Sequence, residues 1–342
     1  MYSYVGKASL CLRKGVIKMN AKKMIVLPLA VMALVSCETN SSVGSYEMKW
    51  VTPTSTPALA FFDQGDNANW VSSSVPRNVV IPAFGTATYD AIVFDGVSGL
   101  NVIKSNGYDW KLADWISGGN FYVVSTKHTA KTDFAAGQTV TGFIKTGNAA
   151  RTFLKLSKDK WNWDYEDSDL TFLGGVADVQ TAMLSNADSS DYWIVADPIY
   201  TAVKGALAAK GVTLNQISDL QADFKDAYDV ETIPAAALFV RGATYESHKD
   251  AVDSFLSETQ SRVDVSIDDP DKVIEALHAY GNDDKVFSRF GFTPSMVTTM
   301  QGDDANKFAM LKRGVITDDK AFANGFASVI LGSTFDDSYF LS

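Results

Sequence analysis

Two aspartates each directly follow an apolar run of the kind that forms a buried strand. Asp197 follows Trp193-Ile194-Val195-Ala196, and Asp95 follows Ala91-Ile92-Val93-Phe94. A helical pattern comes next in both places, opened by a proline in one and by a glycine in the other. A carboxylate at such a position caps its own helix, since Asp is a preferred N-cap, or accepts hydrogen bonds from a ligand. Both roles remain open for both aspartates.

Other polar groups follow further predicted strands. The hydroxyls of residues 54–56 could donate hydrogen bonds to a ligand, as could the backbone and amide groups of residues 147–148. The alternatives are a solvated turn for the hydroxyls and ordinary helix capping for residues 147–148. A glycine after Asp95 would let a ligand come close to the backbone. The predicted ligand-binding residues are Thr54, Ser55, Thr56, Asp95, Gly96, Asn120, Gly147, Asn148, Asp197 and Pro198.

The elements that must position these groups alternate between strands and helices. Strands are expected at residues 46–52, 69–74, 89–94, 110–115, 120–125, 138–144, 170–173, 192–196 and 233–240. Helices are expected at residues 58–62, 149–156, 176–185, 246–262, 270–280, 304–313 and from 199 onward, with 213–228 helical or loop. This alternation indicates an α/β fold. Ligands in such folds bind beyond the carboxyl ends of the strands, which directs attention to the loops at 53–57, 95–98, 145–148 and 197–199.

Several aromatic side chains could stack on a flat ligand. Candidates are Phe61, Phe62, Trp70, Phe121 and Tyr122, although aromatics at such positions more often belong to the core. The run Trp161-Asn162-Trp163-Asp164-Tyr165 could form a clamp at the edge of a cleft. The alternative, which we favour, is simple alternation between surface and core.

Composition and motifs exclude several kinds of chemistry. Both cysteines, Cys11 and Cys37, precede the predicted folded body, so that body has no disulfide and no cysteine-ligated zinc. The three histidines are scattered, the acidic pairs lack EF-hand spacing, and there is no phosphate-binding loop. We therefore expect no metal, no cofactor and no catalytic residue. Without residues 1–36, which hold six of the 30 Lys and Arg and no acid, 24 basic and 40 acidic residues leave a net charge of −16. This charge argues against a nucleic-acid partner.

The N-terminus has the pattern of a secretion signal. Lys22 and Lys23 precede an apolar run at residues 25–34 that is too short to span a membrane. The run ends in Leu34-Val35-Ser36-Cys37, which resembles the bacterial lipobox, in which the cysteine is acylated and becomes the first mature residue. The alternative is a plain secretory signal with an incidental cysteine. We expect a signal peptide at 1–36, with 1–18 an upstream extension, and a tether at 37–45.

The order of the pieces between residues 46 and 290 resembles the extracytoplasmic solute-binding proteins of bacterial ABC importers, in the subgroup of sulfonate, nitrate and thiamine-precursor binders. Two features depart from that subgroup: the 53–57 loop lacks a glycine, and residues 157–169 form an aromatic insert. The matching pieces are Tyr89-Asp90-Ala91-Ile92-Val93-Phe94-Asp95, the crossover at Gly118-Gly119-Asn120, residues 176–184, Trp193-Ile194-Val195-Ala196-Asp197-Pro198 and residues 234–240.

The resemblance implies a type II periplasmic-binding-protein fold, with two α/β lobes, two crossovers between them and closure about a hinge. We expect one lobe at residues 46–137 and 241–342 and the other at 138–240, with hinges near Gln138 and Arg241. The implied protein is a monomer held by lipid on the outer face of the cell membrane. It would deliver a small-molecule solute to the permease and ATPase subunits of an importer.

Two other functions remain open on the sequence. One is an enzyme, since the family resembles a fungal pyrimidine-precursor synthase, but that enzyme relies on a cysteine-rich motif and this chain has no cysteine beyond Cys37. The other is an adhesive or structural surface lipoprotein. For the solute we expect a small polar molecule with a ring, such as a pyrimidine. The loops supply Asp95, Asp197, several hydroxyls and Asn148, and Lys145 is the only nearby cation. An inorganic anion would instead require Arg or Lys at its binding site.

Overall fold

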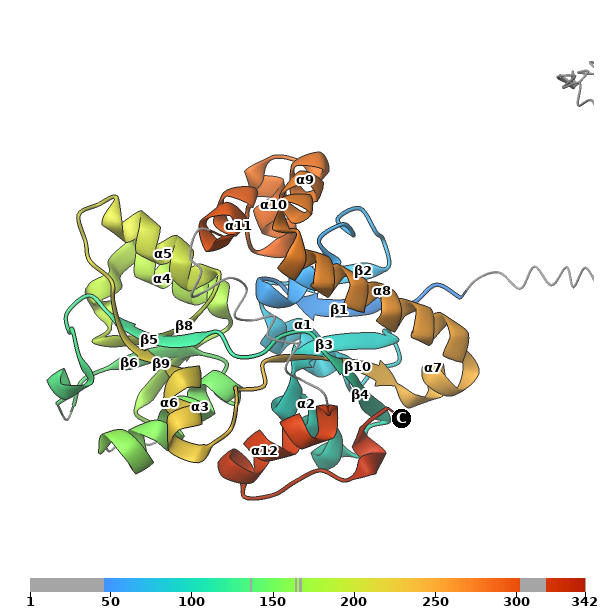
Figure 1. Cartoon of the computed structure of the whole chain (residues 1–342), viewed down its shortest axis with the longest axis horizontal. Coiled ribbons are helices and arrows are strands. Elements are labelled where there is room, and N and C mark those ends of the chain that lie inside the picture. The colour runs from blue at the N-terminus through green and yellow to red at the C-terminus, as the bar shows by residue number, and fades with distance from the viewer. Residues whose placement is uncertain (1–45, 136, 164, 166–167, 302–317, 342) are drawn as a thin grey trace, which may run out of the picture. The chain divides into compact units, whose positions relative to one another are not determined.

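The structure, a computed structural model, describes residues 46–135, 137–163, 165, 168–301 and 318–341. The predicted signal peptide, the tether with Cys37 and the helix expected at 304–313 lie outside these residues. No described helix is long and apolar enough to cross a membrane. Figure 1 shows the arrangement of the helices and strands.

Within the described residues, the first of two sheets has five strands in the order β2-β1-β3-β10-β4. The first three of these run parallel, and β10 is antiparallel to both of its neighbours. The strands are β1 (Trp50–Pro53), β2 (Trp70–Ser73), β3 (Ala91–Asp95), β4 (Trp110–Trp115) and β10 (Ala236–Arg241). The early helices of this lobe are the 3-10 helix η1 (Thr56–Phe61), α1 (Pro76–Ala83) and α2 (Gly96–Asn106).

The second sheet repeats this plan in the order β7-β6-β8-β5-β9. Here β5 is the antiparallel member and takes the place that β10 has in the first sheet. The strands are β5 (Phe121–Ser125), β6 (Val140–Phe143), β7 (Leu170–Leu173), β8 (Tyr192–Ala196) and β9 (Asn215–Asp219). Helices α4 (Val176–Asn186) and α5 (Ile199–Ala208) cover one face, and α3 (Asn148–Leu156) and α6 (Leu220–Tyr228) cover the other (Figure 1).

Both faces of the first sheet are buried, and its strands alternate between two cores. Ile92 and Phe94 pack with the side chains of α1 and α2, whereas Ala91 and Val93 pack with η1 and the later helices. A strand buried on both faces is apolar at every position rather than at every second one. In β3 and β10 such apolar runs predicted the strands. In the second sheet, the predicted bounds of β7 and β8 are confirmed.

The C-terminal third is helical, as predicted. Its helices are α7 (Gly242–Ser247), α8 (Lys249–Asp268), α9 (Pro270–Tyr280), α10 (Asp283–Phe290), α11 (Pro294–Gln301) and α12 (Asp319–Leu331). Single turns of helix lie at Lys131–Asp133, Ser157–Trp161, Ala187–Ser189 and Asp337–Tyr339. Helix α12 contacts both lobes, because Phe322 packs on Trp115 of β4 and Phe326 on Phe224 of α6, with ring centroids 4.9 and 5.1 Å apart.

The chain crosses between the sheets at residues 116–120 and again at residues 229–235. The predicted crossover at Gly118-Gly119-Asn120 therefore joins the two sheets. The division by sheet membership differs from the expected lobes, because β5 pairs in the second sheet and β10 in the first. Neither predicted hinge lies in a crossing: Gln138 precedes β6, and Arg241 ends β10 with an ion pair to Asp90 at 3.1 Å. The strand after each crossing, β5 or β10, inserts between two strands of the sheet that the chain has just entered. The order of the strands along the chain does not reveal this insertion.

One strand was missed, since residues 213–228 were expected to be helical or loop. They contain β9, whose sequence Asn215-Gln216-Ile217-Ser218-Asp219 has one apolar residue. It lies at the edge of its sheet, where fewer side chains are covered, so its composition carries little strand signal. Helices α1, α10, α11 and α12 were also not predicted.

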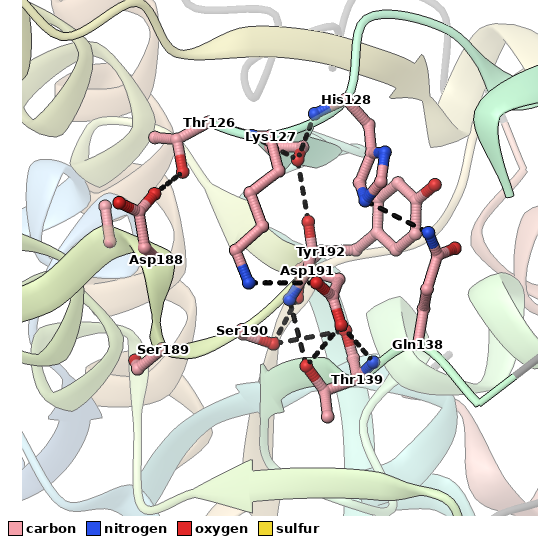
Figure 2. A network of polar contacts seen from close by, with 12 residues as sticks. Thr126, Lys127, His128, Gln138, Thr139, Asp188, Ser189, Ser190, Asp191 and Tyr192 are labelled. Atoms are coloured by element: carbon pink, nitrogen blue, oxygen red, sulfur yellow. Dashed lines mark hydrogen bonds and ion pairs between the residues drawn. The ribbon is translucent and has the colours of Figure 1, made fainter. Parts of the chain in front are cut away.

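A polar network ties strand ends of the second sheet together at the end away from its helix-starting loops. Asp191, just before β8, accepts hydrogen bonds from the backbone N–H and the hydroxyl of Thr139, at 2.7 and 2.9 Å, and pairs with Lys127 at 2.9 Å. Its backbone carbonyl accepts from the hydroxyl of Ser125 at 2.7 Å (Figure 2). The network joins the end of β5 to the starts of β6 and β8.

Candidate ligand-binding site

A cavity of about 110 Å³ lies between the loops that follow the strands of the two sheets. Both lobes and both crossings contribute to its lining. Eight of the ten predicted ligand-binding residues line it: Thr54, Ser55, Thr56, Asp95, Asn120, Gly147, Asn148 and Asp197. These residues come from five different stretches of chain, and the fold brings them together because both sheets direct their post-strand loops at the same space.

Gly96 and Pro198 do not line the cavity. At Gly96, an added Cβ would lie 2.1 Å from the indole of Trp115. The glycine is therefore required by the packing of α2 against β4, and not by approach to a ligand. Pro198 precedes α5 and is its N-cap residue.

The carboxylate of Asp95 bridges two helix N-termini that belong to different lobes. Its Oδ1 accepts from the backbone N–H of Ser98 in α2 at 2.9 Å, and its Oδ2 accepts from the backbone N–H of Asn148 in α3 at 2.7 Å. Part of the residue faces the cavity, yet protein surrounds the carboxylate. This desolvation raises the pKa of Asp95 to about 6, although the two backbone donors and the charge of Arg151 act to lower it.

Asp197 directs its carboxylate toward its own helix. Its Oδ1 accepts from the backbone N–H and the hydroxyl of Thr201, at 3.1 and 2.8 Å. Burial and the negative charge of Asp197 raise the pKa of Tyr122, whose hydroxyl hydrogen-bonds to that carboxylate. The Asp197 carboxylate is thus engaged by Thr201 in the first turn of α5 and by Tyr122, and the backbone carbonyl is the part of this residue that contacts the other lobe.

That carbonyl closes a small inter-lobe network. The hydroxyl of Thr56 donates to Asp197 O at 2.7 Å, and the amide of Asn120 donates to the same oxygen at 2.8 Å and to the Thr56 hydroxyl at 3.0 Å. Thr56 starts η1 in the first lobe, Asn120 lies in a crossing, and Asp197 follows β8 in the second lobe. The hydrogen bonds hold the two lobes together at the edge of the cavity.

Asn148, which lines the cavity, has an unpaired acceptor in its side chain. The residue is fully buried, and its Nδ2 donates to the carbonyl of Pro234 at 2.5 Å. A carbonyl oxygen can only accept, so this contact fixes the amide orientation and identifies the other atom as Oδ1. Among the described residues, Oδ1 has no hydrogen-bond partner. A buried acceptor without a partner is costly, and a ligand N–H or O–H would satisfy it.

Three aromatic rings line the cavity, and two of them were not predicted. Phe121 was among the expected flat faces, whereas Phe94 and Phe143 are the last apolar residues of β3 and β6. Their position beside a post-strand loop is the signal that could have found them. Within the described part of the chain, no Lys or Arg side chain lines the cavity.

The other predicted aromatics serve the core. Phe61, Phe62, Trp70 and Tyr122 are buried and do not line the cavity. Trp163 is buried and stacks on Phe134 at 4.3 Å, and Tyr165 packs on the same ring. The clamp at the cleft edge is therefore wrong, and alternation between surface and core explains the run.

No protein-family model matches the sequence, and no curated protein matches it. Solved structures do match. The ligand-binding component of an ABC-type import system from Staphylococcus aureus, solved with zinc bound, is 12% identical over 86% of this chain and 96% of that one, with a TM-score of 0.62. An ABC transporter structure from Parabacteroides distasonis is 16% identical over 86% and 98%, with a TM-score of 0.55. The alkanesulfonate-binding protein of Xanthomonas axonopodis pv. citri bound to MOPS is 13% identical over 73% and 81%, with a TM-score of 0.52. No group of three or more His, Cys, Asp or Glu able to hold a metal is found in the described part of this chain.

Proposed function

From the fold that this chain shares with the solute-binding proteins of ABC importers, we propose that it binds a small solute between its lobes and delivers it to a membrane permease. The observation that carries the proposal is the cavity itself, which both lobes and both crossings line. Such a cavity opens and closes when the lobes rotate about the crossings. The residues at 116–120 and 229–235 are the proposed hinge.

The proposed solute is small, polar and built on one ring. An engineered apolar cavity of about 150 Å³ holds a single benzene, so a space of about 110 Å³ suits one small ring at most. Phe94, Phe121 and Phe143 offer apolar faces to such a ring, and Asn148 Oδ1 offers an acceptor to an N–H donor on it. A pyrimidine has both features.

The proposed location is the outer face of a bacterial membrane, with the chain held by an acyl group on Cys37. The lipobox-like Leu34-Val35-Ser36-Cys37 after a short apolar run supports this anchor. The proposed role is capture and delivery, and it requires no catalytic step.

A thermal-shift panel tests the binding role and the solute class together. The purified protein is heated with pyrimidines, other single-ring compounds, sulfonates and nitrate. A ligand present at about 100 times its dissociation constant stabilises the folded protein by about 2.7 kcal/mol. Small-angle scattering with the stabilising compound should show a smaller radius of gyration. If only sulfonates or nitrate stabilise the protein, the proposal of a ring-containing solute is wrong. If no compound stabilises the protein and its radius of gyration never changes, the proposed binding role is wrong.

A further inference from the structure

The N-terminus of α3 is aimed at the cleft, and a residue of the opposite lobe already occupies it. The first backbone N–H groups of a helix have no partner within the helix, and the helix dipole makes this end attractive to anions. In this chain, the Asn148 N–H at the start of α3 donates to Asp95 Oδ2 at 2.7 Å. The other oxygen of the same carboxylate receives the Ser98 N–H at the start of α2.

The surroundings of this carboxylate disfavour a second negative charge in the cavity. Asp95 lines the cavity, and none of the described lining residues is a Lys or an Arg. Two like charges a few ångströms apart repel strongly where protein excludes water. Arg151 of α3 is close enough for its charge to act on Asp95, but it does not line the cavity. An anionic ligand would therefore face Asp95 with no cation among the described lining residues, and the Asn148 N–H at the start of α3 would already be occupied.

The unpaired oxygen of Asn148 points to the complementary feature of the ligand. It belongs to Asn148, whose backbone N–H donates to Asp95, so the Asp95 carboxylate and the unpaired acceptor meet at the same residue of α3. Both groups favour a ligand that donates hydrogen bonds.

We propose that Asp95 is the built-in anion of the cleft, and that it determines specificity by taking the place of a ligand's anionic group at the N-terminus of α3. The site thereby selects uncharged, hydrogen-bond-donating ligands and rejects sulfonates and carboxylates. This inference rests on the proposed binding role of the cavity.

The test replaces Asp95 by a residue whose side chain still caps α2 but no longer accepts from the N-terminus of α3. Serine is a preferred N-cap, so Asp95→Ser keeps a partner for the Ser98 N–H and frees the Asn148 N–H for an added anion. The probes are ethanesulfonate and the matched pair benzamide and benzoate, measured by thermal shift and titration calorimetry. We expect the Asp95→Ser protein to bind ethanesulfonate or benzoate at least about tenfold more tightly than the unchanged protein, which corresponds to the strength of a favourable helix N-terminus.

The matched control is Asp219→Ser. Asp219 caps α6 by accepting from the backbone N–H groups of Gln221 and Ala222, but it does not line the cavity. We expect this variant to gain no affinity for either anion. A second variant, Asp95→Asn, keeps the shape of the side chain and removes its charge, and we expect it to bind the anions more tightly than the unchanged protein.

The outcomes separate this inference from the binding role. If the unchanged protein binds the anions as tightly as Asp95→Ser does, the inference is overturned and the binding role stands. The same conclusion follows if the Asp95 variants show no change in anion affinity while benzamide or another uncharged ring binds. If Asp95→Ser does not fold, Asp95→Asn decides alone. Failure of every protein to bind either anions or uncharged rings overturns both proposals.

Discussion

The hydroxyl of Thr56 donates a hydrogen bond of 2.7 Å to the backbone carbonyl of Asp197, 141 residues further along the chain. The two residues belong to different lobes, so this bond links the lobes directly. Asn120 in the crossing donates to the same carbonyl at 2.8 Å. The lobes are thus in direct contact beside the cavity.

Replacing Thr56 by Val should favour opening of the cleft. Valine keeps the volume but removes both the donor to the Asp197 carbonyl and the acceptor of the Asn120 amide. The closed form should therefore lose about 2 kcal/mol, the usual contribution of two hydrogen bonds. Small-angle scattering of the ligand-free protein should show a larger radius of gyration. The control is Thr52→Val, because the Thr52 hydroxyl accepts from Trp70 Nε1 within the first lobe. An equal change of radius in both variants would contradict the inter-lobe role.

Asp95 should make the folded protein more stable in acid. Its pKa is about 6 in the folded protein and near 3.8 in an unfolded chain. The folded state therefore holds the proton more tightly, and the contribution of Asp95 to stability is complete below about pH 4 and is lost as the pH rises through 6. The free energy of unfolding in urea, relative to that of Asp95→Asn, should fall by an amount on the order of 2 kcal/mol between pH 4 and pH 7. A flat difference would mean that the carboxyl group is not desolvated.

Asp191 should show the opposite dependence. Burial acts to raise its pKa, but hydrogen bonds from Thr139 and the pairing with Lys127 outweigh this and lower the pKa to about 2. The contribution of Asp191 to stability is therefore present above about pH 4 and is lost as the pH falls through 2. Against Asp191→Asn, urea unfolding should show an advantage on the order of 2 kcal/mol at pH 7 that shrinks toward pH 2. A constant advantage over this range would assign the effect to packing and not to charge.

Removing the Phe326 ring should destabilise both lobes together. The side chain is fully buried and packs on Phe224 of α6, while Phe322 of the same helix packs on Trp115 of β4. A buried Phe→Ala change costs about 3–5 kcal/mol. The free energy of unfolding in urea should fall by that amount for Phe326→Ala, and by clearly less for Phe340→Ala, whose side chain is only partly buried. Equal losses would contradict the importance of α12 for the packing of the second lobe.

Replacing Cys37 by Ala should release the protein from the membrane fraction or leave it as an uncleaved precursor. Cys37 lies outside the described residues, and the prediction follows from the lipobox-like sequence around it. Only the thiol of that segment can carry a thioether-linked lipid. Cell fractionation with Cys11→Ala as the control measures the effect, and a correctly cleaved Cys37→Ala protein that stays with the membrane would rule the anchor out.

The sequence by itself predicted most strands and the set of loops around the cavity. Apolar runs such as residues 91–94 and 192–196 are local signals, because a strand covered on both faces must be apolar along its whole length. The turn from such a strand into a helix is also local, so Asp95, Asn148 and the hydroxyls near Thr56 could be placed beyond strand ends. The α/β class and the two lobes followed from the same patterns.

Only the tertiary structure decided which sheet each crossing strand joins and which groups meet in the cleft. Strands β5 and β10 insert into sheets built from distant parts of the chain, and the polar strand β9 is held mainly by its neighbour β5. The carboxylate of Asp95 accepts a hydrogen bond from the backbone N–H of Asn148, 53 residues further along the chain. Because of this contact, a helix-capping residue also bridges the two lobes. The physical reason is range: propensities and caps act over a few residues, whereas strand pairing and desolvation depend on everything that packs around a group once the chain has folded.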